Sequence, residues 1–359
     1  MFKIYQKYLI NNFLVKFLYL SLIFFSLTFI LSILEEITFL KDIEIPFWYP
    51  YFLTTLSAPI TLFEIFPFIF LLSTQFLFYE LFKKKELVLL KANGLNNLKI
   101  IKILFLLAFV IGIFNIVVYY NFASKLNFQY SIIKNKFSDD NKYLAMVTQS
   151  GLWIKDEINE KKLLIKSELI KVNILSKTII NEFNDDFDLI RTIQSEKIDI
   201  TQNNWIIFKP VITKNNISEE FDNPIYLETN FNEKRINNLF SNISTLDILK
   251  LFTLIEDYKK IGYSPDEIFL HLSKLFTMPI FYGILTVLSA IIMFNLSNDK
   301  PLIFHIALGI LMSVIIYYMN FIFSSLASNG KIPIITSIFF PILILSFFTI
   351  IGLIDINEK

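Results

Sequence analysis

Six apolar segments, each long enough to cross a lipid bilayer as a helix, constrain this chain more than any other feature of its sequence. Only 18% of the residues are charged, below the roughly one quarter that is usual in soluble proteins. The first segment is too long for the core of a signal peptide, so we expect it to remain as a membrane span. The sequence therefore predicts a polytopic α-helical membrane protein with six transmembrane helices, at residues 13–34, 52–81, 103–121, 268–296, 301–325 and 332–353.

Hydropathy falls between the third and fourth segments, over residues 122–263. Many short strands separated by turn residues favour an antiparallel sandwich or jelly roll there, with a hairpin turn at Gln202-Asn203-Asn204. The alternation of apolar and polar residues predicts strands at 143–149, 151–155, 162–170, 171–180, 197–201 and 205–208. The expected domains are the helices of 1–121, an all-β domain at 122–243, an amphipathic connecting helix at 244–263 and the helices of 264–359.

A polar island at residues 83–102 separates the second and third apolar segments and starts with three lysines. Glu86, Leu87, Leu90 and Leu95 follow at near-helical spacing, which favours a short amphipathic helix along the membrane surface, with Gly94 as its stop. Such a helix gives a soluble partner a surface to bind. A solvated basic loop that only sets the topology explains the same residues, and the spacing does not separate the two interpretations.

The positions of the lysines predict the orientation of the spans. The N-terminal residues, the 83–102 island, Lys300 and Lys359 fall on one side of the membrane. The acidic loop at 35–45 and Lys331 fall on the other side. The positive-inside rule assigns the first side to the cytoplasm, so both termini are expected inside and the β domain outside.

Several kinds of chemistry have no matching residues in the sequence. There is no cysteine, and the two histidines, His271 and His305, cannot form a His-rich metal site. The phosphate-binding G-x-x-x-x-G-K-[ST], the G-x-S-x-G and the H-E-x-x-H motifs do not occur. A net charge of +1 gives no case for nucleic acid. We therefore expect no catalytic residues, no metal and no cofactor, and a protein that is not an enzyme.

Two features inside the apolar segments are candidates for function. Glu64 lies in the second segment between Pro59 and Pro67, and an ionisable group at membrane depth is a functional candidate. A carboxylate that water reaches near the outer interface is the simpler interpretation. Gly309 and Ser313 form a small-x-x-x-small pair, which allows another helix to approach closely, either within the chain or at a subunit seam.

Several short pieces of the chain resemble the LptF/LptG lipopolysaccharide-transport permeases. In the piece E-L-V-L-L-K-A-N-G-L, Glu86, Leu87, Ala92 and Gly94 match the family's acidic residue, aliphatics and A-x-G. The order and spacing of the pieces along the whole chain make the resemblance specific. The G-L-W-x-K-D piece and the end of the first span look more like LptG. The other matching pieces are Pro67-Phe68, Gly151-Leu152-Trp153-Ile154-Lys155-Asp156, Gly330-Lys331-Ile332-Pro333 and Pro341.

The resemblance implies a permease subunit of an ABC transporter in the inner membrane of Gram-negative bacteria, which extracts lipopolysaccharide and passes it to a periplasmic bridge. The implied partners are a cytoplasmic ATPase dimer of the LptB type, a homologous permease of the LptF type and a bridge protein of the LptC type. The β domain would be a periplasmic jelly roll, and spans one and five would be lateral gates. A coupling helix at 83–98 would bind the ATPase through Glu86, Leu87, Leu90, Ala92 and Gly94.

One position departs from the LptG pattern. Family members often carry basic residues that face substrate phosphates at the outer end of span one, whereas this chain has Glu35 and Glu36 there. The nearest lysine is Lys41, which joins Glu64, Gly309 and Ser313 as a candidate substrate or gate residue. Two alternatives are the LptF paralogue with the same role, and a membrane-anchored assembly or sensor protein whose β domain binds a periplasmic partner without transport.

Overall fold

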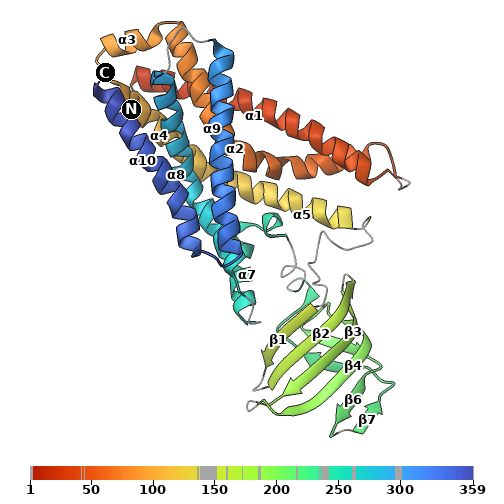
Figure 1. Ribbon diagram of the computed structural model, residues 1–359. Helices are drawn as coiled ribbons and strands as arrows, with labels where there is room; N and C mark the ends of the chain where they lie inside the picture. The colour runs from red at the N-terminus through yellow and green to blue at the C-terminus, as the bar shows by residue number, and fades with distance from the viewer. Residues whose placement is uncertain are drawn as a thin grey trace. The chain divides into compact units, whose positions relative to one another are not determined.

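A computed structural model describes residues 3–358 apart from 42, 44, 136, 138–151, 159–160, 172, 185–186, 216, 234–235, 237–241, 261–263 and 296–300. The strand expected at 143–149 and the position of Lys300 lie outside these described residues. The chain divides into two compact units, which Figure 1 shows. They are a helical unit, Met1–Tyr130 with Phe269–Lys359, and a sheet unit, Ser131–Ile268.

In the described part of the chain, six helices are long and apolar enough to cross a membrane, which confirms the six predicted spans. Each helix extends past its apolar segment at one end or both, because polar residues can continue the backbone hydrogen bonds outside the lipid. The helices are α1 (Ile4–Phe39), α2 (Tyr49–Lys83), a third span formed by α4 (Asn97–Phe114), the π-helix η1 (Asn115–Tyr120) and α5 (Asn121–Asn135), then α8 (Asp266–Asn295), α9 (Leu302–Ser328) and α10 (Ile334–Glu358).

The third span differs most from its prediction. The sequence predicts its end at residue 121 and the start of the β domain at 122, but the helix continues to Asn135. Residues 122–135 are polar enough to lower the hydropathy, yet they contain no proline or glycine that would end a helix. The boundary at 122 is therefore corrected, and the first strand among the described residues begins at Leu152.

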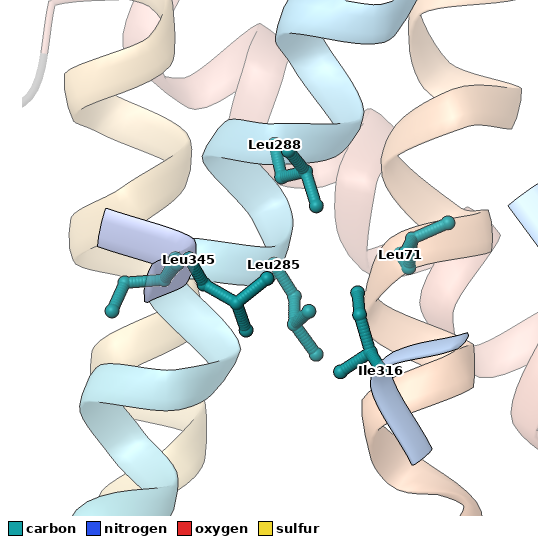
Figure 2. Packing of buried hydrophobic residues seen from close by; sticks show 6 residues of the cluster. Leu71, Leu285, Leu288, Ile316 and Leu345 are labelled. Atoms are coloured by element: carbon teal, nitrogen blue, oxygen red, sulfur yellow. The ribbon is translucent and has the colours of Figure 1, made fainter. Parts of the chain in front are cut away.

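α2 and α8 are the most buried of the six helices. Leu71 of α2, Leu285 and Leu288 of α8, Ile316 of α9 and Leu345 of α10 pack into one cluster (Figure 2). In the apolar stretch of α8, 67% of the residues are buried, against 17% in α1 and in α9. The large apolar side chains of α1 and α9 therefore face outward, as expected of helices that lipid or another membrane protein covers.

The sheet unit contains an eight-stranded sheet whose described pairings are all antiparallel. The strand order is β1-β2-β3-β4-β5-β8, and β6 pairs with β4 and β7. β4 and β5 form the hairpin predicted around 202–204. The inserted β region is thus confirmed, while the jelly-roll topology stays a prediction. The strands are β1 (Leu152–Ile158), β2 (Lys161–Lys171), β3 (Ile174–Phe183), β4 (Leu189–Asp199), β5 (Asn204–Phe208), β6 (Val211–Lys214), β7 (Ile217–Glu220) and β8 (Ile225–Glu228).

The chain after β8 closes over the sheet through two buried contacts. Trp205 of β5 is fully buried, and its Nε1 donates a hydrogen bond to the Phe231 carbonyl at 2.7 Å. Asp156 of β1 accepts hydrogen bonds from the backbone and side-chain nitrogens of Asn230, both at 2.9 Å. Because unpaired polar groups are costly in a core, these bonds fix the end of β8 against β1 and β5.

The connecting helix α7 (Ile248–Lys260) lies within the expected 244–263. Asp247 accepts a hydrogen bond from the Lys250 backbone nitrogen at 3.0 Å and so caps the first turn of the helix. Farther along the chain, the Ser264 hydroxyl accepts a bond from the Asp266 nitrogen at 3.4 Å at the start of α8. Local side-chain caps therefore set both helix starts.

Glu182 of β3 is a buried carboxylate in the sheet unit. It accepts hydrogen bonds from Lys161 Nζ at 2.7 Å and from Arg191 Nε at 2.5 Å, and 2% of its side chain is exposed. Burial alone would raise the pKa of Glu182, but the hydrogen bonds and positive charges of Lys161 and Arg191 outweigh burial and hold the pKa below its usual range.

The sheet unit is therefore expected to lose stability in acid through Glu182. Because its folded pKa lies below the unfolded value of about 4.5, its contribution is complete above that pH and is lost as the pH falls through the folded pKa. Glu182→Gln should cost about 1–3 kcal/mol at neutral pH and flatten the acid dependence. Hydrogen exchange of the β3 and β4 amides in the full-length protein measures both effects, and an equally steep acid dependence in the variant would contradict the assignment.

Candidate functional site

The 83–102 island forms a short helix, α3 (Glu86–Ala92), held by left-handed residues at both ends. Lys85, with φ of +59°, separates α2 from α3. Gly94 has φ of +83°, which glycine adopts at little cost. The N–H groups of Gly94 and Leu95 donate to the carbonyls of Lys91 and Leu90, at 2.9 and 3.2 Å. This Schellman motif ends the helix at the predicted stop, and α4 begins directly after it.

α3 has one buried face and one exposed apolar face. Leu87 is buried, as is Leu95 in the turn after the helix, so both anchor the segment to the helical unit. Val88 and Leu89 are 65% and 62% exposed. Exposed apolar side chains next to each other on a short helix leave a surface that a partner can cover. Among the other coupling candidates, Ala92 and Gly94 are exposed, while Glu86 and Leu90 are half-buried.

Hydrogen bonds and ion pairs connect α3 and the end of α2 to α1. Tyr8 Oη of α1 donates to Glu86 Oε2 at 2.5 Å. Lys16 of α1 forms an ion pair with Glu80 of α2, and Lys84 Nζ lies 2.6 Å from the other oxygen of Glu80. The hydrogen bond to Glu80 raises the pKa of Lys84. Because these contacts join three helices, a force on α3 reaches α1 and α2 directly.

Both termini of the chain lie at the same end of the helical unit as α3 (Figure 1). Asn97 at the start of α4 donates through Nδ2 to the Ile356 carbonyl near the end of α10, at 3.5 Å. The two chain termini and the lysine-rich 83–102 island therefore lie at the same end of the helical unit, as the lysine pattern predicts.

At the opposite end of α1, the acidic residues that depart from the family pattern have different environments. Glu36 is buried and its Oε1 accepts a hydrogen bond from Tyr130 Oη of α5 at 2.6 Å. Glu35 is exposed, and Lys41 is exposed in the turn that follows α1. Glu36 therefore has a structural contact within the helical unit, and Lys41 is the accessible cation at this end of α1.

Gly309 of α9 lies against α2. A Cβ atom at this position would overlap the side-chain carboxamide of Gln75, which is itself buried. Ser313, one turn along α9, is also buried. The sequence leaves open whether Gly309 and Ser313 face a helix of the same chain or another subunit. For Gly309 the structure shows a helix of the same chain, because α9 packs closely against α2 at this residue.

Glu64 is exposed on the surface of α2, and its charge interacts with Lys274 of α8. Lys274 is not among the residues predicted from the sequence, although a lysine inside the apolar segment 268–296 is a usable signal. Val88 and Leu89 are not among them either, because their exposure depends on how α3 packs. Tyr8 gives no local signal, because its partner Glu86 is 78 residues away in the chain.

The model of the family "Lipopolysaccharide export system permease LptF/LptG" matches residues 7–355. A comparison with curated proteins found no match. The matched residues include α3, the helices of the helical unit and the strands of the sheet unit. The chain therefore belongs to the LptF/LptG family of lipopolysaccharide export permeases.

Proposed function

We propose that this multi-pass inner-membrane protein is the permease half of an ABC transporter that a separate ATPase drives. The observation that carries the proposal is the exposed pair Val88 and Leu89 on α3, at the end of the helical unit where both chain termini lie. A family of lipopolysaccharide export permeases needs an energy source, and an apolar helix face at one end of the spans suits the groove of a soluble partner.

The proposed complex has four kinds of partner. They are a cytoplasmic ATPase dimer of the LptB type, a second permease of the LptF type, a bridge protein of the LptC type and lipopolysaccharide itself. We assign this chain to the LptG type because of the G-L-W-x-K-D piece, most of which forms β1. The α3 end then faces the cytoplasm, and the sheet unit is a periplasmic domain of jelly-roll type.

The coupling residues act by passing movement from α3 to the spans. Closure of the ATPase dimer displaces α3, and the Tyr8–Glu86 hydrogen bond carries the displacement to α1. The Lys16–Glu80 ion pair carries it from α2 to α1 as well. The displacement does work only if the two states of the transporter bind the lipid differently, so we place the lipid against the helices that move.

Glu86→Lys tests the coupling assignment. In the described structure Glu86 Oε2 is bonded to Tyr8 while Oε1 accepts no hydrogen bond, so Oε1 remains for a cation of the ATPase. Reversing the charge should weaken ATPase binding by at least about thirtyfold, because it replaces a salt bridge by a repulsion. Co-purification of the ATPase with the tagged permease measures the loss.

Tyr8→Phe is the matched control for Glu86→Lys. It removes the internal hydrogen bond but leaves the Glu86 carboxylate in place for the ATPase. We expect this variant to bind the ATPase normally while export slows. A Glu86→Lys protein that binds the ATPase and exports lipid like the unchanged protein would refute the coupling role, and a chain that never co-purifies with a P-loop ATPase would favour the assembly or sensor alternative.

A further inference from the structure

The π-helix η1 joins α2 and α8 through two tyrosines. Tyr119 Oη donates to the Pro59 carbonyl of α2 at 3.1 Å, and Tyr120 Oη lies 2.8 Å from His271 Nε2 of α8. The ring of Phe63 in α2 lies 5.2 Å, centroid to centroid, from that of Tyr120. π-helical turns are rare and occur frequently at functional sites, because they change which side chains face a neighbour.

Two charged residues lie close in sequence to the residues of this aromatic contact. Glu64 follows Phe63 in α2, and Lys274 lies one turn after His271 in α8. Glu64 is 15 residues from the start of α2 and Lys274 is eight residues from the start of α8, so both lie inside their helices. Within the described part of the chain neither side chain forms a hydrogen bond or close ion pair, and the two opposite charges lie within range of a longer electrostatic attraction.

Both charged residues are at least partly exposed on the helical unit. Glu64 is exposed, and Lys274 and His271 are partly exposed, whereas Tyr120 behind them is fully buried. Charged groups on a membrane span are costly where only lipid tails cover them, so they mark a place that water or a polar ligand reaches. The hydrogen bond between the buried Tyr120 and His271 holds this part of α8 against the π-helix.

We propose that Lys274 binds a phosphate group of the transported lipid, and that Glu64 is the counter-charge of Lys274 when no lipid is present. The inference rests on the proposed function. An ammonium group offers three donors to phosphate oxygens, and a hydrogen bond between two charged groups is stronger than one between neutral groups.

Glu64 gives the site a means of release. Its carboxylate competes with the phosphate for Lys274 and repels the phosphate, so it limits how long the lipid stays bound. A transport site has to bind its cargo and also let it leave. Lys274 therefore favours entry of a phosphorylated lipid, and Glu64 favours its departure.

The test uses the full-length permease in its complex with the ATPase and second permease, in phosphatidylcholine nanodiscs. The probes are fluorescent bisphosphorylated lipid A, the same lipid without phosphates, and phosphatidylglycerol. The unchanged complex should prefer the phosphorylated lipid A over the dephosphorylated one by about tenfold or more. Lys274→Gln should remove this preference, Lys274→Arg should keep most of it, and Glu64→Gln should slow release of the phosphorylated lipid only.

Lys102→Gln, in an exposed position of α4, is the matched control and should leave the preference unchanged. Equal loss of affinity for both forms of lipid A in Lys274→Gln would overturn the proposal. It would also be overturned if each single variant bound lipid more weakly and the double variant, Glu64→Gln with Lys274→Gln, bound normally. That result would mean that the two residues form a structural pair. An equal preference for phosphatidylglycerol would show that any phospholipid phosphate suffices and would overturn the assignment to cargo. If the unchanged complex binds none of the three probes, the proposed function itself fails.

Discussion

Val88→Asp together with Leu89→Asp is expected to abolish association with the ATPase and to stop lipid export. Both side chains are exposed on α3 and would become buried in the proposed interface. Burying each contributes roughly 1.5 kcal/mol or more, so losing both weakens binding by at least about a hundredfold. The introduced carboxylates add a further cost because they would have to shed their water. Co-purification from detergent-solubilised membranes and export in cells depleted of the native permease measure the two effects.

Val88→Ile with Leu89→Met is the matched control, since it keeps the apolar area of α3. This control should bind the ATPase, and the aspartate variant should keep its Tm, because substitutions of exposed side chains usually change stability little. Normal ATPase binding by the aspartate variant would mean that the exposed face of α3 is not the contact, even if the protein remains an export permease.

Gly309→Leu is expected to prevent stable packing of α9 against α2. A Cβ at this position already overlaps the Gln75 carboxamide, and because Gln75 is itself buried, a leucine there has to push this side chain out of the contact. Overpacking of a buried contact costs about 1–3 kcal/mol and more when backbones must separate. We expect a strongly reduced yield of folded protein and a lowered Tm in detergent.

Gly309→Ala with Gln75→Ala tests whether the clash is the cause. Gly309→Ala alone should lower the Tm, and removing the Gln75 side chain should restore most of the loss, so the two changes are non-additive. Additive effects of the two substitutions would show that Gly309 does not face Gln75 in the folded protein. Gly330→Ala is not a suitable control, because that glycine has φ of +67°.

The sequence predicts the membrane spans well because their signal is local and strong. A run such as residues 332–353, most of which lies in α10, has to form a helix in lipid wherever the rest of the chain lies. The end of the third span is different, because hydropathy reports where lipid ends and not where the helix ends. Residues 122–135 remain helical although they are polar, and only breakers such as proline would have marked another boundary.

The candidate site is predictable to the extent that its residues are neighbours in the chain. Glu86 and Gly94 lie in one short segment, so their pattern predicts α3 and its stop. The Tyr8–Glu86 bond and the nearness of Glu64 to Lys274 depend on how distant helices pack. No periodicity in the sequence encodes such pairs. The sequence therefore predicts α3 but not the hydrogen bond that joins α3 to α1.

The two tyrosine contacts of α1 have a consequence for how a lipid could pass beside this helix. α1 is bonded through Tyr8 and Lys16 in its first half and through Glu36 near its last turn, and between Leu20 and Glu36 only Thr28 is buried. A helix attached at both ends cannot move aside as a whole. Passage along α1 therefore requires bending of the turns between Leu20 and Glu36, and the Tyr8–Glu86 bond lets a moving α3 impose that bending.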